Sequence, residues 1–262
     1  HKVILSGNTE QVVSFVDARA NGSLFNELEV TNTSKEGVVF ATHAYITSVL
    51  YSTETPISNA SNVVFTGSAK ISGDNWGYDL SIIPGSQGWA LSADQTVLGN
   101  LYLFGASVSL GGYGLTIGGD VIHTFGTLNI NGGSLIVKGD YRIQTPTEEK
   151  GKYTHSSGIL TMLNANDYVL VHGDFVIDGV NGSTRTSHFT AGVLEVKGNF
   201  TQLSTSTSNY AQHNFRASGT HKVLLSGDEV QTVSFADYNN SYFNELELTN
   251  SNKGVVFQSS VV

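Results

Sequence analysis

The chain of 262 residues has no cysteine, only 3 prolines and little charge. The absence of cysteine excludes a disulfide framework and any metal site built from thiolates. Only 13% of the residues are Asp, Glu, Lys or Arg, and the net charge is -9. There is no cluster of Lys or Arg and no apolar run as long as a transmembrane helix, so the composition argues against a nucleic-acid partner and against membrane insertion.

Glycine is plentiful, with 29 residues, and 39% of the chain is hydrophobic. The apolar residues are mostly Val, Leu, Ile and Phe, which is enough for a core and argues against a disordered chain. A chain of this length is compatible with a single all-β domain. No amphipathic helical period is found, so we predict an all-β fold.

The beginning of the chain returns near its end. HKVILSG at His1 reappears as HKVLLSG at His221, and QVVSF, FNELEVTN and GVVF return as QTVSF, FNELELTN and GVVF. Self-similarity of this kind is the signature of repeat architectures. We therefore divide the chain into one long unit, residues 1–220, and the start of the next, residues 221–262, continuous with it. We expect His221 to restart the same surface that His1 begins.

A shorter period lies inside the long one. Gly99, Gly119 and Gly139 are evenly spaced, each is followed by Asp or Asn, and apolar residues alternate around them. Alternation with period two is typical of half-buried strands. This predicts a parallel β-solenoid (a β-helix), right-handed, with about 20 residues per coil. The same phrase recurs after longer gaps, and its further members are Gly173, Gly198 and Gly227, with Asp120, Asp140 and Asp174 among the acidic partners.

The longer gaps predict loops inserted at the corners of the solenoid, within residues 145–157, 179–187 and 204–212. Residues 41–95 fit the period least well, although strands are still expected there. The Gly-Asp and Gly-Asn phrases are interpreted as turns in which glycine accepts a positive φ and the side chain bonds nearby backbone. Tyr141, Phe175 and Phe200 are predicted to stack in the core rather than to form a ligand platform.

At this level of detail the chain resembles a known kind of repeat. The strings SGTHKVLLSGDEVQTVSF, YFNELELTN, LNINGGSLIVKGDYRIQT, NDYVLVHGDF and TAGVLEVKGNFTQ are similar to a tandem repeat of large secreted or cell-surface, adhesin-like proteins of Gram-positive, Clostridia-type bacteria. The likeness covers nearly the whole chain and is weaker over residues 41–95. It implies an extracellular β-rich repeat and carries no catalytic or ligand motif.

The chemical alternatives fit the residues less well than this structural interpretation. Gly111-Gly112-Tyr113-Gly114 begins like a calcium-binding nonapeptide, but Thr116 stands where Asp is required. The column of Asp residues also contains Asn, which suits turns better than calcium. A polysaccharide-cleaving site needs converging acids, and the closest pairs here, Glu148-Glu149 and Asp74 with Asp79, fit a loop and turns. The histidines show no zinc-ligand spacing.

Carbohydrate binding is the alternative that stays open. Trp76, Tyr78 and Trp89 lie close in sequence and could stack on sugar rings, or they could cover the core where the solenoid is irregular. The prediction is therefore a non-catalytic structural module of an extracellular surface or fibre protein, without a cofactor or metal. Its partners would be further copies of the repeat, in tandem or end to end, and the second choice is a polysaccharide-binding module. A glycan-active enzyme comes third.

Overall fold

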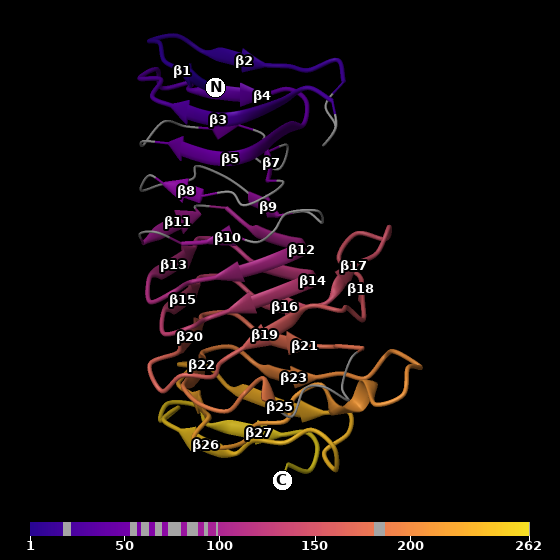
Figure 1. Ribbon diagram of the computed structural model, residues 1–262. Helices are drawn as coiled ribbons and strands as arrows, with labels where there is room; N and C mark the ends of the chain where they lie inside the picture. Colours follow the sequence, from indigo (N-terminus) through magenta and orange to yellow (C-terminus); the bar gives the residue numbers. More distant parts are fainter. Residues whose placement is uncertain are drawn as a thin grey trace.

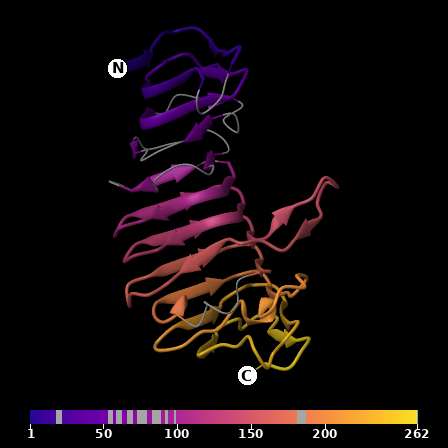
Figure 2. The same cartoon turned by 45° about the vertical axis from the view of Figure 1, so that its right-hand side comes forward.

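The computed structural model describes residues 1–17, 22–52, 57–58, 63–65, 70–72, 80–82, 89–91, 94–97, 99–180 and 187–261. The fold is all-β, and nearly all of its strand pairs are parallel. The strands lie one above another in an elongated stack with the two termini at opposite ends (Figures 1 and 2). The predictions of an all-β fold and of parallel sheets are confirmed, and the arrangement is compatible with a β-helix.

A large sheet runs the whole length of the stack. Its central path contains β1 (Lys2–Leu5), β3 (Leu24–Val30), β5 (Ala44–Ser52), β7 (Val63–Phe65), β9 (Leu80–Ile82), β12 (Leu101–Ser109), β14 (Val121–Asn129), β16 (Tyr141–Ile143), β21 (Phe175–Ile177), β23 (Phe200–Gln202), β25 (Gln231–Phe235) and β27 (Val255–Phe257). Three short strands pair beside this path: β8 (Lys70–Ser72) on β5, β10 (Trp89–Ala90) on β12, and β19 (Ile159–Thr161) on β14.

Within the described ranges the remaining strands form three smaller sheets. A seven-stranded parallel sheet is made of β11 (Gln95–Val97), β13 (Gly114–Ile117), β15 (Ser134–Val137), β20 (Tyr168–Val171), β22 (Val193–Val196), β24 (Lys222–Leu225) and β26 (Glu245–Leu248). A three-stranded parallel sheet contains β2 (Gln11–Val13), β4 (Val38–Phe40) and β6 (Ile57–Ser58). The antiparallel hairpin β17 (Thr145–Pro146) and β18 (Tyr153–Thr154) projects from the side of the stack (Figure 2), and η3 (Ala211–His213) is a single 3-10 turn.

The pairing register follows the short period of the sequence. Val121 pairs with Leu101 on one side and with Tyr141 on the other, so each partner lies one short period away. After Tyr141 the next partner is Phe175, because the β17–β18 hairpin and the segment after it intervene. Insertions therefore lengthen the connection between paired strands without changing the pairing. The predicted loop at 179–187 lies mostly outside the described residues.

Alternation along each strand places one face in a continuous core. In β15, β20, β22 and β24 of the seven-stranded sheet every second residue is buried, and the buried residues stand on one another through the register. One such column contains Val137, Val171, Val196 and Leu225, all fully buried. Each fully buried Val or Leu side chain contributes roughly 1.5–3 kcal/mol of transfer free energy. The stack is therefore held by repeated apolar layers as well as by backbone hydrogen bonds.

The two copies of the long repeat form the same strand pairs. Lys2 pairs with Glu27 as its equivalent Lys222 pairs with Glu245, and both lysines form ion pairs with a glutamate of the neighbouring strand. The strand β1 belongs to the large sheet and β24 to the seven-stranded one, because long strands such as β5 join two sides of the stack into one sheet.

The side of the stack that holds β1 also holds β8, and the seven-stranded sheet continues along it (Figure 1). The segment between β8 and β11 lies largely outside the described residues. That His221 restarts the surface begun at His1 therefore stays a prediction.

Candidate functional site

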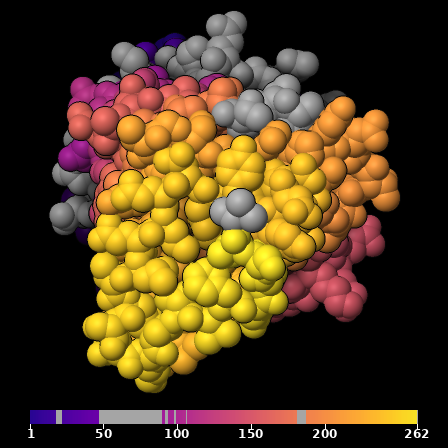
Figure 3. All heavy atoms as spheres, turned by 90° about the horizontal axis from the view of Figure 1, so that it is seen from below, coloured from indigo at the N-terminus to yellow at the C-terminus, as the bar shows by residue number. Residues whose placement is uncertain are grey.

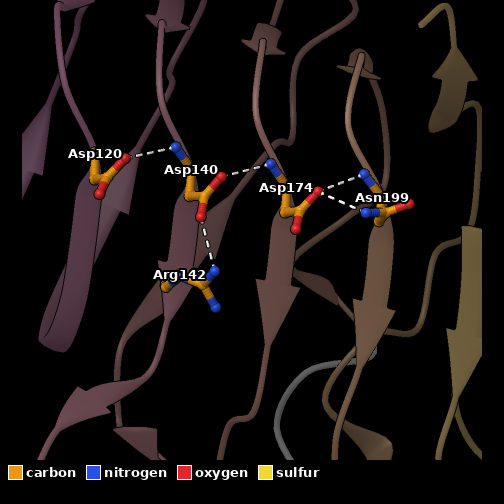
Figure 4. A network of polar contacts seen from close by, with 5 residues as sticks. All are labelled: Asp120, Asp140, Arg142, Asp174 and Asn199. Carbon is orange, nitrogen blue, oxygen red and sulfur yellow. Dashed lines mark hydrogen bonds and ion pairs between the residues drawn. The ribbon is translucent and has the colours of Figure 1, made fainter. Parts of the chain in front are cut away.

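A column of Asp and Asn side chains runs along the stack, one residue before each strand of the central path of the large sheet from β12 to β23, and Figure 4 shows four of its members. The side-chain Oδ1 of each member accepts a hydrogen bond from the backbone N–H of the next. The pairs are Asn100 with Asp120 (2.6 Å), Asp120 with Asp140 (2.8 Å), Asp140 with Asp174 (2.8 Å) and Asp174 with Asn199 (2.7 Å). We call this column the Asx ladder. It joins strands that are 20 to 34 residues apart in sequence.

Glycine precedes each member of the Asx ladder and forms a second, backbone ladder beside it. The N–H of Gly119 donates to the carbonyl of Gly99 at 2.9 Å, and the same bond recurs along the stack. Its further members are Gly139 to Gly119 (2.9 Å), Gly173 to Gly139 (2.9 Å) and Gly198 to Gly173 (3.0 Å). Successive Gly-Asx pairs are thus joined through both a main-chain and a side-chain bond.

The reason for glycine is space rather than backbone conformation. None of these ladder glycines has a positive φ, so the predicted reason for them is wrong. A Cβ at Gly139 would lie 2.1 Å from Oδ1 of Asp120, and one at Gly119 would lie 2.3 Å from Oδ1 of Asn100. Such contacts are far inside van der Waals distance. Any side chain here would displace the acceptor that the ladder depends on.

The carboxylates of the Asx ladder all accept hydrogen bonds from the backbone of a neighbouring strand. One oxygen of each carboxylate is occupied by a backbone N–H, and Asp140 also forms an ion pair with Arg142 at 2.7 Å. The guanidinium of Arg142 lies 5.0 Å from the centre of the Tyr153 ring in β18. The ladder is thereby tied to the projecting hairpin. Within the described part of the chain, no group of three His, Asp or Glu side chains could hold a metal ion.

The ladder does not continue through Gly227 and Asp228 as the phrase predicts. Asp228 is exposed, and Thr232 takes the next place by donating its N–H and hydroxyl to Oδ1 of Asn199, both at 2.8 Å. Because Thr232 and not Asp228 occupies the ladder position, Gln231 lies between Gly227 and the ladder and hydrogen-bonds to the neighbouring backbone. The sequence did carry a signal for Gln231, because Gln11 stands at the same position of the first copy.

The side chain of Gln231 is a buried amide that links two strand connections through hydrogen bonds. It is 1% exposed, and its Oε1 accepts from the N–H of Gly227 at 2.8 Å. Its Nε2 donates to the carbonyls of Val196 (2.9 Å) and Gly198 (2.6 Å) on the preceding strand connection. All its hydrogen-bonding groups are used, which is what a buried amide requires.

The aromatic residues predicted for the core lie in it. Tyr141, Phe175 and Phe200 are fully buried, with ring centres 5.6 Å and 5.3 Å apart in sequence order. The hydroxyl of Tyr141 lies 3.1 Å from Nδ1 of His123, and burial raises the pKa of this phenol above its ordinary value. Since no face of these rings reaches solvent, they serve as packing and offer no platform to a ligand.

The predicted sugar platform falls largely outside the described residues. Trp76 and Tyr78 are not among them, and the same is true of Asp74 and Asp79. For Trp89 only the backbone is described: it pairs with Val108 as part of β10. Carbohydrate binding through these three aromatic residues therefore stays a prediction.

Two buried carboxylates that the sequence did not single out also support turns. Asp167, 1% exposed, accepts from the backbone N–H groups of Gly132 (2.5 Å), Leu163 (2.6 Å) and Asn164 (3.0 Å). Asp178 accepts from the N–H and the hydroxyl of Thr205. Asp167 borders a polar hollow of about 190 Å³, which is smaller than the roughly 300 Å³ at which ligand pockets begin.

The last strands of the stack expose residues whose equivalents in the first copy are buried. At the C-terminal end, which faces the viewer in Figure 3, Leu248 and Phe257 are 49% and 40% exposed. Their equivalents in the first copy, Val30 and Phe40, are fully buried because β5 and β6 cover the strands that hold them. The difference in exposure follows from the strand pairing: among the described residues β26 and β27 are the last strands of their sheets, whereas β3 and β4 are covered by later strands.

Comparisons with known proteins provide no information on function. No protein-family model, no curated protein and no solved structure matches the chain. In the described part of the chain, no helix is long and apolar enough to cross a membrane. The observations that bear on function are therefore the Asx ladder and the layered core.

Proposed function

We propose that the parallel sheets close into a right-handed β-solenoid of about 20 residues per coil, and that this solenoid is a non-catalytic structural module of an extracellular surface or fibre protein. The Asx ladder carries the proposal. Its uniform hydrogen bonds link strands one strand spacing apart, whatever the length of the loop between them. A structure of this kind grows in one dimension, and its stability is roughly a sum over neighbouring coils.

The use of the acidic residues supports a mechanical role. Hydrolases and lyases of sugars need carboxylates that converge on a groove. Here Asp120, Asp140, Asp167, Asp174 and Asp178 each accept hydrogen bonds from the turns and strand ends that they organise. The extracellular location and the tandem copies rest on the resemblance described above and on the internal repeat. In such an array the partner of each unit is another copy of itself.

Distances between spin labels test the solenoid. Because the chain has no cysteine, Thr116→Cys can be combined cleanly with Leu224→Cys or with Glu247→Cys. These positions stand in one column, four and five pairing steps apart. At about 4.8 Å per step, the two backbone separations are roughly 19 Å and 24 Å. Double electron–electron resonance should give label distances that differ by one strand spacing.

A second pair of labels tests closure of the coil. Glu195 with Thr201 and Leu224 with Ser234 each join the seven-stranded sheet to the large sheet, one step apart along the stack. In a closed solenoid both pairs must give the same distance, since each column is parallel to the axis. Unequal distances, or labels in one column that are not evenly spaced, would refute the solenoid. A tandem of two units should also be a rod lengthened by about nine or ten strand spacings, or roughly 43–48 Å.

A further inference from the structure

The N-terminal end of the chain exposes residues whose equivalents in the second copy are buried. Leu225 of β24 is fully buried, whereas its equivalent Leu5 is only partly buried. The same contrast separates Gln231, 1% exposed, from Gln11, and Val223 from Val3. These pairs have almost the same sequence around them. The difference must therefore come from what lies above each copy.

In the second copy, β24 is covered by β22 and the connection that follows β22. Lys222 pairs with Val193 and Leu225 with Val196. The backbone N–H groups of Lys222 and Ser226 donate to carbonyls of Gly192 (3.0 Å) and Val196 (3.1 Å). Side chains add to this contact, because the hydroxyl of Ser226 donates to Glu195 and the amide of Gln231 donates to two carbonyls of the same segment.

The first copy holds the same groups in the same order. Ser6 and Gln11 are the equivalents of Ser226 and Gln231. Gln11 already accepts a hydrogen bond from the amide of Asn32 at 2.8 Å, as Gln231 does from Asn250 at 3.1 Å. The two copies therefore share this amide bond on the lower side of the contact, and on the upper side of the first copy Lys2, Ile4 and Ser6 are exposed.

The space around one glycine differs between the two copies, because a segment lies over Gly227 and none of the described segments lies over Gly7. A Cβ at Gly227 would lie 2.2 Å from the carbonyl oxygen of Lys197, in the covering segment. At the equivalent Gly7 the nearest atom would be Nδ2 of Asn32, at 3.5 Å, which is an ordinary contact. Neither glycine has a positive φ. Glycine at position 7 is thus unnecessary for the structure of this chain and becomes necessary only when a segment like residues 193–202 lies over it.

We infer that the surface formed by β1, Gly7 and β2 is a docking site for a preceding copy of the repeat, which binds through its equivalent of residues 193–202. The inference rests on the proposed tandem function and specifies its junction. Val193 to Val196 of the preceding copy pair with Lys2 to Leu5, in the register that β22 and β24 adopt. Gln11 donates its amide hydrogens to two carbonyls of the incoming segment, and Ser6 donates its hydroxyl to the glutamate equivalent to Glu195.

A chimera tests the junction in the full chain. Residues 187–220 are joined directly in front of His1, which reproduces the natural sequence around Thr220 and His221. Hydrogen exchange of the amides of Lys2 and Ser6 is measured in the chain and in the chimera. Docking predicts that these two amides exchange at least about 10-fold more slowly in the chimera, because the added segment then covers both of them, as the segment around β22 covers Lys222 and Ser226.

The substitution Gly7→Ala is the decisive variant, and Gly227→Ala is its matched control. Gly7→Ala should leave the thermal midpoint of the chain nearly unchanged but abolish the protection of Lys2 and Ser6 in the chimera. Gly227→Ala should lower stability in both proteins, because its site is covered in both. Fast exchange at Lys2 and Ser6 in the chimera, or no effect of Gly7→Ala there, would overturn the docking site. The label distances that test the solenoid would be unaffected, so the two failures are distinguishable.

Discussion

The buried imidazole of His221 predicts a loss of stability in mild acid. His221 is fully buried beside the rings of Phe189 and Phe215, with ring centres 5.4 Å and 6.0 Å away. Neither of its ring nitrogens has a hydrogen-bond partner. Burial lowers the pKa of His221 to about 4, against 6.5 for an exposed imidazole. The folded protein therefore holds this side chain neutral over a pH range in which the unfolded chain protonates it.

The sign and size of the effect follow from proton linkage. Between pH 6.5 and about 4 the unfolded chain binds more protons at this residue than the folded chain does, so the free energy of unfolding falls as the pH falls. Above pH 6.5 the full contribution is present, and below pH 4 both states are protonated. At about 1.4 kcal/mol per pH unit, the difference between the two pKa values corresponds to a loss of about 3 kcal/mol.

Urea unfolding at a series of pH values between 4 and 7.5 measures this loss. His221→Leu and His221→Asn both remove the titrating group, and only the second keeps a polar side chain in the core. The carboxylates titrate in all three proteins, so their contribution cancels in the difference. As the pH falls from 7.5 to 4, both variants should gain about 3 kcal/mol relative to the original chain. A difference that stays constant with pH would refute the reasoning.

Substitutions at three further positions test the ladder and the core. Gly139→Ala places a Cβ 2.1 Å from Oδ1 of Asp120 and should lower the free energy of unfolding by about 1–3 kcal/mol through overpacking, measured as a lower urea midpoint. An unchanged midpoint would show that the ladder adjusts to the added methyl group without loss of stability. Asp174→Ala leaves the N–H and side-chain amide of Asn199 without their acceptor and should cost about 1–3 kcal/mol in the same assay, while Asp174→Asn should restore most of it. Phe200→Ala empties a fully buried site and should cost about 3–5 kcal/mol, and a value near zero would place the ring outside the core.

Much of the strand register was predictable from the sequence because it depends on local spacing. Gly99, Gly119 and Gly139 recur at one constant spacing, and the strands that follow them pair in that register. Alternation of apolar residues likewise identified the buried columns, since side chains of a strand point alternately to its two faces. Tyr141 and Phe200 could be placed in the core on the same grounds.

What the sequence could not supply depends on contacts between neighbouring strands. The reason for glycine in the ladder is the approach of a side chain from the preceding member of the series, and no local pattern reveals that distance. Asp228 matched the phrase but lies in a short insertion, so that Gln231 and Thr232 take over its role. Asp167 was missed because one of its backbone partners, Gly132, belongs to a turn 35 residues earlier.

The Asx ladder gives the stack a direction. Each side-chain oxygen accepts from the residue that comes later in the chain, and the glycine N–H groups beside it donate to carbonyls that come earlier. In each step of the ladder the N–H donor therefore points toward the N-terminal end of the stack and the acceptor toward the C-terminal end. A rod built from such units is polar. The C-terminal end of one unit fits the N-terminal end of the next, whereas two ends of the same kind would bring donors against donors or acceptors against acceptors. Such an assembly contains only head-to-tail junctions, and its two ends, being different, lengthen at different rates.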